Sequence, residues 1–413
     1  MVTTRNNYKR WQARIIKEAL KIWRVVVISG ARQSGKTTLV RQITTKNDTF
    51  VSLDDPTSLA AALDDPKGFV NHPKGTLILD EIQKAPSLLL SIKQAVDISN
   101  RKGQYLLTGS ADIRTLPAVN DSLAGRIAHI RLRTLTAGEI LGKGAAFLEQ
   151  AFKQDWPRQI IGYDKAAIIK LAMRGGYPEY VRLPENLRHS GWHDEYVKSI
   201  LSRDLRDVAN IHRQDSIENV LNVLAAWSGK LMDATAICGK LSIARDTFNS
   251  YTNALISLCI FERLPPWVRT DYEKVGHKYK IYSTDTGLMA GILHWHEKDV
   301  LLDPDKSGKI VESFVFNELK AQIDLHYGYS LYHYRDRAGR EIDFIIESDN
   351  GALLGVEVKS GSVVSKDDFR HMIWFKYNIV PDKEFIGIVL YSGENVLPFG
   401  PNMYAVPIAA LWS

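Results

Sequence analysis

Short hydrophobic runs separated by amphipathic stretches dominate the first third of the chain. Residues 24–29, 76–79 and 104–107 each contain an uninterrupted run of aliphatic or aromatic side chains, and residues 128–132 contain a looser one. Such runs are typical of strands buried on both faces of a parallel sheet. The stretches between them have helical periodicity. The pattern therefore predicts a doubly wound α/β domain over residues 1–135.

The pattern changes twice beyond residue 135. Residues 136–215 are mostly helical in periodicity, with a break at the Gly-Gly-Tyr-Pro turn of residues 175–178, and we expect a helical lid or linker there. Residues 216–290 combine short helix-like stretches with strand-like ones. Residues 291–413 begin with a longer helix-like stretch and continue with strand-like runs, which predicts a further α/β domain.

Length and composition narrow the class of protein. A chain of 413 residues is too long for one ordinary core, and its 45% hydrophobic and 24% charged residues are usual for a globular protein. No hydrophobic run approaches the roughly eighteen residues of a membrane span, and the polar start lacks the apolar segment of a signal peptide. We therefore expect a cytoplasmic protein with no membrane partner. Cys238 and Cys259 lie in apolar, helix-like surroundings without metal-site spacing, and a net charge of +6 permits a nucleic-acid partner without requiring one.

Residues 30–37 fit the phosphate-binding pattern GxxxxGK[ST]. They lie between a predicted buried strand and a predicted helix, which is the setting this loop requires. There the backbone N–H groups and the helix N-terminus point at anionic oxygens. Lys36 would reach the β- and γ-phosphates of ATP, and the Thr37 hydroxyl would bind Mg²⁺.

Two acids and two hydroxyls follow the next predicted strands. Asp80 and Glu81 end the second run, where Asp80 would hold Mg²⁺ and Glu81 would polarise the attacking water. Thr108 and Ser110 end the third run, so either hydroxyl would be placed to sense the γ-phosphate, unless this is a plain turn at the end of a strand. The predicted nucleotide-binding residues are Gly30, Ala31, Arg32, Gln33, Ser34, Gly35, Lys36, Thr37, Thr38 and Thr108.

Arg126 precedes the last predicted strand of this domain. An arginine there would stabilise the transferring phosphoryl group as an arginine finger, acting on the nucleotide of a neighbouring subunit. The alternative is an arginine that is solvated or paired with an acid. The first role requires a homo-oligomer.

These motifs together resemble the AAA-type ATPase domain of a widespread bacterial and archaeal family of ATP-binding proteins. The resemblance rests on VISGARQSGKTTLV, LILDEIQ, LLTGS and LAGR, in this order, and it covers nearly the whole chain, since that family carries a C-terminal domain of uncharacterised function. It implies ATP and Mg²⁺ as cofactors. The chain departs from broader AAA ATPases at the sensor position, where they usually have Asn and this chain offers Thr108 and Ser110.

Residues 231–251 have the rhythm of a helix-turn-helix, and the strand-like residues 261–264 and 278–282 would supply a β-wing. We therefore predict a winged-helix-like domain over residues 216–290. Its second helix would present polar side chains to a DNA major groove. Winged helices also serve as packing modules, and this second helix is not strongly basic. The candidate DNA-contacting residues are Arg245, Thr247, Asn249 and Ser250.

Residues 342–359 carry a second candidate site. Asp343, Glu357 and Lys359 resemble the D…ExK core of PD-(D/E)xK nucleases, in which two carboxylates hold Mg²⁺ and the lysine steadies the attacking hydroxide. Glu357 and Lys359 share a face of one strand by the period of two. Asp343 joins them only if the numbers of paired residues in the hairpin sum to an even total. We therefore predict a three-residue loop, residues 349–351, with Gly351 left-handed and residue 348 paired with 352, or a bulge of the same parity.

Glu312 is a fourth candidate for this nuclease-like domain, which we place at residues 291–413. It shares a helix face with Val315, Phe316 and Leu319, and a carboxylate on an apolar face is uncommon without a partner. The charged loop of residues 335–340 would suit a phosphate backbone or be a solvated turn. The predicted metal ligands of the chain are Thr37, Asp80, Glu312, Asp343 and Glu357, and the predicted catalytic residues are Lys36, Glu81, Arg126, Asp343, Glu357 and Lys359.

Two functions fit these motifs. The first is an ATPase that couples its nucleotide state to a module that binds, or with Mg²⁺ cuts, nucleic acid. The second is an ATP-dependent switch that binds DNA or protein and whose nuclease-like domain is inactive. They differ in whether Asp343 and Lys359 serve catalysis.

Overall fold

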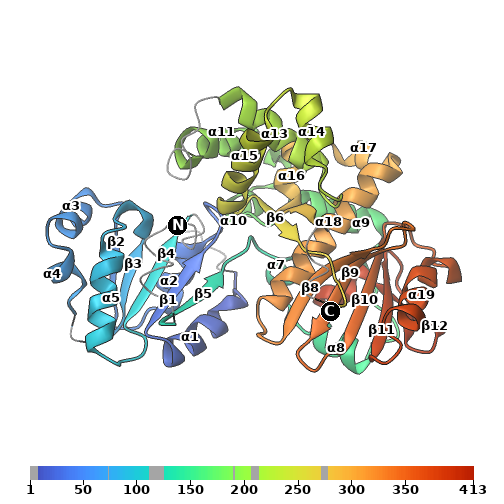
Figure 1. The fold of residues 1–413 in the computed structure, drawn as a ribbon, viewed down its shortest axis with the longest axis horizontal. Coiled ribbons are helices and arrows are strands. Elements are labelled where there is room, and N and C mark those ends of the chain that lie inside the picture. Colours follow the sequence, from blue (N-terminus) through green and yellow to red (C-terminus); the bar gives the residue numbers. More distant parts are fainter. Residues whose placement is uncertain (1–7, 73, 111–124, 189–190, 206–213, 271–277) are drawn as a thin grey trace. The chain divides into compact units, whose positions relative to one another are not determined.

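The chain folds into two compact units (Figure 1). The computed structural model describes residues 8–72, 74–110, 125–188, 191–205, 214–270 and 278–413. One unit comprises residues 1–134 with 254–259, and the other comprises residues 135–253 with 260–413. The predicted subdivision of residues 136–413 into three domains stays a prediction. In the part of the chain that is described, none of the helices combines the length and the apolar character that crossing a membrane demands.

The first unit contains a parallel five-stranded sheet in the order β2-β3-β4-β1-β5. This confirms the predicted doubly wound α/β fold, and it adds β2, which the sequence analysis did not predict. One strand, β4, separates the strand that precedes the P-loop from the strand that ends in Asp80. The elements are α1 (Gln12–Ile22), β1 (Val25–Ser29), α2 (Lys36–Ile43), β2 (Thr49–Ser52), α3 (Pro56–Asp64), α4 (Pro66–Val70), β3 (Leu77–Asp80), α5 (Leu88–Ile98), β4 (Tyr105–Gly109) and β5 (Ile127–Arg131).

Helices make up most of the described residues between 136 and 215, as predicted. The helices and strands expected for the winged-helix-like segment are present as α14, α15 and the antiparallel pair β6 and β7, although residues 271–277 of the expected wing lie outside the described residues. The elements are α7 (Ala137–Ile140), α8 (Phe147–Lys153), α9 (Lys165–Arg174), α10 (Pro178–Arg182), α11 (Trp192–Ser199), α13 (Gln214–Ala226), α14 (Ala234–Leu241), α15 (Arg245–Ser257), β6 (Phe261–Leu264), β7 (Lys280–Ser283), α16 (Thr286–Ile292) and α17 (Glu297–Leu302).

The Gly-Gly-Tyr-Pro break packs tightly against the start of α16. The Asp285 carboxylate accepts a hydrogen bond from the Gly176 N–H (2.8 Å) and another from the Leu288 N–H (2.8 Å), so one side chain caps α16 and fixes the turn. A Cβ atom on Gly175, whose φ is +65°, would lie 2.3 Å from the Asp285 carboxylate. Gly175 therefore leaves no room for a larger residue.

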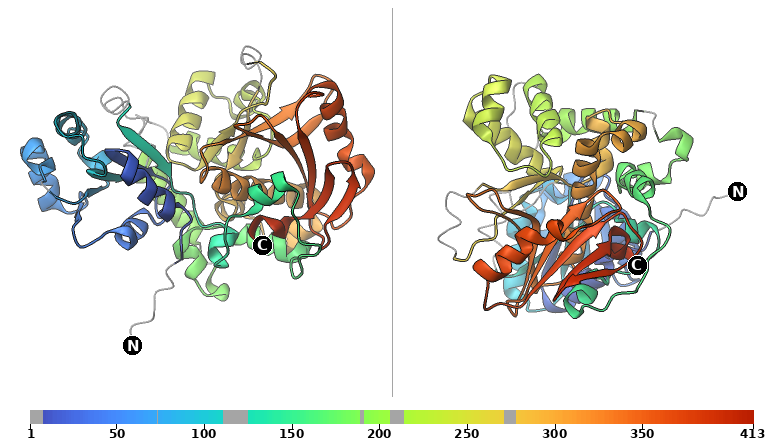
Figure 2. Two further views of the ribbon diagram at one scale, coloured as in Figure 1. Left: turned by 90° about the horizontal axis from the view of Figure 1, so that it is seen from below. Right: turned by 90° about the vertical axis from the view of Figure 1, so that its right-hand side faces the viewer.

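The C-terminal sheet has six strands in the order β12-β13-β11-β10-β9-β8, with parallel pairs in its middle and antiparallel pairs at both sides. The two further views show its twist (Figure 2). Asp303 and Pro304 start the long helix α18, because the Asp303 carboxylate accepts from two backbone N–H groups of the first turn. The elements are α18 (Pro304–Ile323), β8 (Tyr329–Arg335), β9 (Glu341–Ser348), β10 (Leu353–Lys359), α19 (Arg370–Asn378), β11 (Phe385–Tyr391), β12 (Leu397–Gly400) and β13 (Met403–Pro407).

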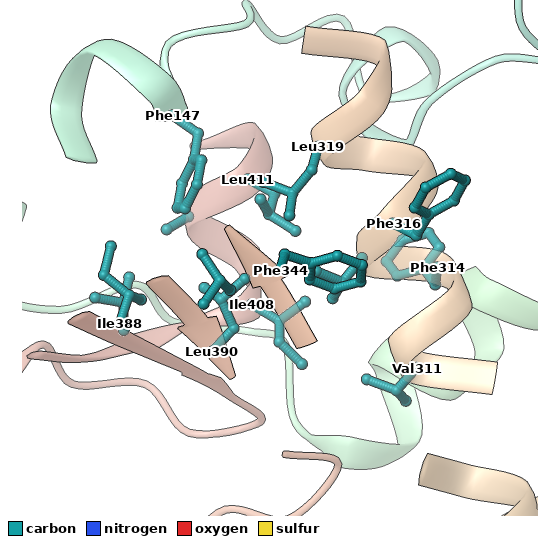
Figure 3. Packing of buried hydrophobic residues seen from close by; sticks show 14 of the residues in the cluster. Phe147, Val311, Phe314, Phe316, Leu319, Phe344, Ile388, Leu390, Ile408 and Leu411 are labelled. Carbon is teal, nitrogen blue, oxygen red and sulfur yellow. The ribbon is translucent and has the colours of Figure 1, made fainter. Parts of the chain in front are cut away.

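The main core lies between α18 and one face of this sheet. Phe316 of α18 and Phe344 of β9 are both fully buried and meet between helix and sheet (Figure 3). The Tyr282 ring of β7 stacks on Phe316 with ring centroids 4.2 Å apart. The opposite face of the sheet carries a second core, which includes Phe375 of α19 and Phe385 of β11. Hydrophobic side chains of β9 and β10 are therefore buried on both faces of the sheet, as is typical of central strands covered by helices on each side.

Glu318 of α18 is buried and accepts a hydrogen bond from the Ala137 N–H (2.7 Å). Burial raises the pKa of this carboxyl to about 8, the Ala137 N–H and the Arg174 guanidinium lower it, and Glu139 raises it. The unfolded chain loses this proton near pH 4.5, whereas the folded chain keeps it until about pH 8. The contribution of this one carboxyl to the free energy of unfolding is therefore most favourable below pH 4.5 and falls as the pH rises to 8, by up to about 1.4 kcal/mol per pH unit.

We expect Glu318→Gln to flatten this dependence, because glutamine stays neutral and keeps an oxygen for the Ala137 N–H. Urea unfolding at pH 6 and pH 8.5 should show the free energy of unfolding of the variant gaining on that of the wild type as the pH rises. Glu149→Gln is the matched control, since Glu149 is exposed and its pKa is lowered by Lys153. Parallel pH profiles for Glu318→Gln and the wild type would contradict the assignment.

Candidate functional site

The P-loop connects β1 to α2, as predicted. Gly30 sits where a Cβ atom would lie 2.2 Å from the Leu132 carbonyl oxygen, so no larger residue fits there. Gly35 has φ +96° and directly precedes Lys36, the first residue of α2. The Lys36 ammonium group is buried and donates to the carbonyl oxygens of Gly30 and Ala31, each at 2.9 Å. These bonds hold its charge along the inside of the loop.

Asp80 lies beside the first turn of α2. Its carboxylate accepts hydrogen bonds from the Thr37 hydroxyl, at 2.9 and 3.2 Å for its two oxygens, and from the Thr108 hydroxyl. Since β4 lies between β1 and β3, Thr108 bridges the gap that separates Asp80 from the loop strand. A hydroxyl and a carboxylate in contact at a helix N-terminus are oxygen ligands suited to Mg²⁺.

Glu81 is held in a strained backbone conformation. Its φ of +61° is left-handed, which costs a residue with a side chain about 1 kcal/mol or more. Its N–H donates to the Thr108 hydroxyl (3.3 Å), and its carboxylate accepts from the Gln83 amide. Gln83 also donates to the Ser110 hydroxyl (3.0 Å). The hydroxyl proton of Thr108 is donated to Asp80, so Thr108 positions the two acids, and its predicted role as a phosphate sensor stays a prediction.

Arg10 supports the P-loop and was missed by the sequence analysis. Its buried guanidinium donates to the carbonyl oxygens of Ser34 (2.8 Å) and Arg133 (2.5 Å). It thus ties the loop to the segment that follows β5. The first residues of the chain are amphipathic and basic, so the sequence does not distinguish this arginine from one on the surface.

Arg126 lies at the start of β5, and its N–H group forms an ion pair with Asp97 (2.5 Å). Because β5 is parallel to β1, the first residues of β5 lie beside the first residues of β1. The P-loop follows the last residue of β1, at the other end of these strands. Arg126 therefore does not face the nucleotide site of its own chain. Leu123 and Ala124, which begin the LAGR motif, lie outside the described residues.

The β9–β10 hairpin has the predicted register. Phe344 pairs with Val356, and Leu353 pairs with Glu347. The three-residue loop of residues 349–351 closes it, with Gly351 at φ +82°, and the Ser348 N–H donates to the Ala352 carbonyl at 3.0 Å. The ladder ends at Phe344, and the Asp343 carboxylate accepts from the N–H of Val358 (2.9 Å). The hairpin therefore brings Asp343 beside β10, as the D…ExK prediction requires.

Glu312 and Glu357 also belong to this cluster. Burial raises the pKa of Glu357 well above its usual value, and the carboxylates of Asp343 and Glu312 raise it further. Burial likewise raises the pKa of Glu312 to about 7, which Lys280 lowers and Asp343 raises. Lys359 pairs with Glu357 (3.2 Å) and with Asp368 (3.5 Å). The four predicted residues thus lie in one charged cluster.

A residue that was expected only as part of the β-wing lies inside this cluster. The Lys280 ammonium of β7 is 2.7 Å from Glu341, 3.2 Å from Glu312 and 3.6 Å from Asp343, and its side chain is 2% exposed. Tyr282, two residues on, donates its hydroxyl to Glu312 (2.6 Å). One indication of such a contact was present in the sequence, because a carboxylate on an apolar helix face, such as Glu312, is uncommon without a partner.

These residues do not fit a divalent cation as they stand. Over the ranges that the structure describes, no group of three or more acidic, histidine or cysteine side chains has the arrangement of a metal site. The Glu312 oxygen that faces the cluster already bonds to Lys280 and Tyr282, and the two Asp343 oxygens face Lys280 and the Val358 N–H. The predicted metal ligation by Glu312, Asp343 and Glu357 is therefore not supported by the geometry.

The candidate DNA-contacting side chains lie on α15. Arg245, Asn249 and Ser250 are exposed and Thr247 is half-buried, whereas Phe248 on the same helix is fully buried. The helix thus has a polar outer face, which leaves DNA contact a prediction.

Comparisons with known proteins agree with the assignment of residues 30–37 as a P-loop. Residues 23–141 match the model of the AAA domain, residues 165–299 match a domain of unknown function, DUF8612, and residues 307–411 match another, DUF4143. Residues 23–141 are thus an AAA-type P-loop domain. Two curated relatives are the uncharacterized proteins Mb2031c of Mycobacterium bovis and Rv2008c of Mycobacterium tuberculosis. Each is 27% identical over 402 residues, which cover 97% of this chain and 83% of the relative.

Solved structures with partial likeness include AMPPCP-bound DnaA from Aquifex aeolicus, at 14% identity and a TM-score of 0.29, covering 59% of this chain and 86% of that one. A RuvB variant from Thermotoga maritima has 20% identity and a TM-score of 0.26, covering 61% of this chain and 88% of that one. At these values neither likeness bears on what this chain does.

Proposed function

We propose that this chain is an Mg²⁺-dependent ATPase whose nucleotide state acts as a switch on the rest of the chain. The observation that carries the proposal is the hydrogen-bonded row Thr37, Asp80 and Thr108, with Glu81 beside it. Thr37 and Asp80 would hold Mg²⁺, and Lys36 with the loop N–H groups would hold the phosphates. Glu81 would accept the proton of the attacking water.

Each of these roles requires a side chain with a fixed position, and the hydrogen bonds among Thr37, Asp80 and Thr108 fix those positions. Thr108 fixes the carboxylate of Asp80 and the backbone of Glu81 through one hydroxyl group. Gln83 restrains the Glu81 carboxylate. A base held in this way is placed before the reaction begins, so less reorganisation is needed during it.

Arg126 would serve the site of a neighbouring subunit in a homo-oligomer. It precedes β5, whereas the P-loop lies at the other end of the parallel strands, so another copy of the chain would have to bring a nucleotide to it. Its ion pair with Asp97 is about one-third exposed on both sides and would be exchanged at low cost for a phosphate contact.

Nucleic acid is the proposed partner of the switch, through the exposed polar face of α15. Nuclease chemistry is not part of the proposed function, because both Asp343 oxygens and one Glu312 oxygen face Lys280, Tyr282 or a backbone N–H group. The second of the two functions drawn from the sequence is therefore favoured.

The test is phosphate release from ATP by the full chain. We expect turnover with Mg²⁺ and its loss when EDTA removes the metal, since the negative charges of Asp80 and the phosphates would then face each other without a cation between them. Phosphate release that equals the protein-free background, or that persists in EDTA, would contradict the proposal.

A further inference from the structure

The carboxylate cluster of the C-terminal sheet is built around a buried lysine. Glu312 from α18 and Glu341 and Asp343 from β9 surround the Lys280 ammonium at 3.2, 2.7 and 3.6 Å. The side chain is 2% exposed, so water does not compensate its charge. We propose that Lys280 takes the place of a divalent cation here, so that the cluster binds no metal ion and instead fastens β7 to the sheet.

The donors and acceptors of the cluster match an ammonium group. Lysine offers three N–H donors at about 2.7–3.2 Å, whereas Mg²⁺ requires about six oxygens at 2.0–2.1 Å. Glu341 gives one oxygen to Lys280 and the other to Arg335 (2.8 Å). Glu312 receives a second donor, the Tyr282 hydroxyl. Donors of the chain therefore already engage both oxygens of Glu341 and the Glu312 oxygen that faces Lys280.

Lys280 remains ionised in spite of its burial. Burial alone would lower its pKa, but the charges of Glu312, Asp343 and Glu341 hold its pKa well above the usual value. Lys359 brings a second positive charge to Glu357 (3.2 Å). A divalent cation entering the cluster would meet two fixed ammonium groups, which repel it.

The backbone keeps Lys280 in place. It pairs with Leu264 of β6 on one side and forms a bridge with Leu231 on the other. Nearby, the Gly229 N–H donates to the Ile281 carbonyl (2.8 Å), and a Cβ atom on Gly229 would lie 3.2 Å from the Glu312 carboxylate. Backbone pairing on both sides of β7 therefore holds Lys280 beside Glu312.

The proposal is independent of ATP hydrolysis and is tested by Mn²⁺ binding. The full chain is titrated with Mn²⁺ without nucleotide and followed by EPR, in an Asp80→Asn background that removes the metal-binding carboxylate of the P-loop. We expect no binding that depends on Asp343, so that adding Asp343→Asn leaves the titration unchanged. Sub-millimolar Mn²⁺ binding that Asp343→Asn abolishes would overturn the proposal.

Removing the lysine gives a complementary test. Lys280→Ala leaves the partly buried carboxylates of Glu312, Glu341 and Asp343 without their cation, and we expect its melting temperature to fall by about 10 °C. Added Mn²⁺ should raise the melting temperature of this variant, because an ion that binds only the folded chain stabilises it. The melting temperature of the wild type should not respond.

Lys278→Ala is the matched control, since Lys278 lies two residues away, is 55% exposed and pairs with Asp233. It should melt as the wild type does, with or without Mn²⁺. If Lys280→Ala melts like Lys278→Ala, the ammonium does not hold the cluster and the proposal fails. If Lys280→Ala does not fold, the EPR comparison of Asp343→Asn still decides, because it retains the native lysine.

Discussion

Lys36→Ala should weaken ATP binding about tenfold to a hundredfold and reduce turnover by at least about a hundredfold. A hydrogen bond between an ammonium group and a charged oxygen contributes about 1.5–3 kcal/mol, and each 1.4 kcal/mol corresponds to a tenfold change in Kd. Lys36 is the only residue of the GxxxxGK[ST] loop with an ammonium group. Turnover falls further, because the charge on the phosphate oxygens changes during transfer.

The measurements are isothermal titration with a non-hydrolysable ATP analogue and phosphate release with ATP. Lys46→Ala is the matched control, because it removes the same charge from an exposed position just beyond α2 and should leave both values unchanged. Melting curves of both variants establish that the loss is local, since Lys36 also donates to two carbonyl groups of its loop. Wild-type turnover in Lys36→Ala would exclude the P-loop as the site of hydrolysis.

The P-loop site was predictable because its residues are close in sequence or follow strands of one sheet. Residues 30–37 form a single loop whose geometry its glycines determine, and the carboxyl ends of β3 and β4 meet beside it. Asp80 and Thr108 could therefore be placed near Thr37 from the pattern of strands alone. The hairpin of β9 and β10 was predictable for the same reason, because its register depends on the conformation of one glycine, Gly351.

Contacts between distant segments were not predictable in this way. Two helices, α16 and α17, separate Lys280 from the helix that carries Glu312, and Asp343 lies further on, beyond α18 and β8. Nothing in the sequence of β7, Lys280-Ile281-Tyr282-Ser283, distinguishes a buried lysine from an exposed one on a wing. All four residues are buried. Arg10 and the P-loop give a second case, since this contact joins an N-terminal arginine to carbonyl oxygens of two other segments. Every residue has a backbone carbonyl oxygen, so the sequence does not indicate which of them accepts a hydrogen bond from a distant side chain.

Glu81→Gln should retain ATP binding and lower turnover by about a hundredfold to ten-thousandfold, which is the usual contribution of a general base. Glutamine has the size of glutamate and keeps an oxygen for the Gln83 amide, but it cannot accept the proton of water. Phosphate binding depends on Lys36 and the loop, which this substitution leaves intact. Titration and phosphate release again give the two values, with Glu18→Gln, an exposed glutamate of α1, as control.

A second variant separates chemistry from folding at this position. Glu81 has φ +61°, where glycine is favoured, so Glu81→Gly should lose turnover while its free energy of unfolding stays the same or rises. Loss of activity together with unchanged stability would identify the carboxylate itself as the working group. Normal hydrolysis by both variants would show that another residue activates the water, and Gln83, which bonds to Glu81 and to Ser110, would then be the next candidate for orienting it.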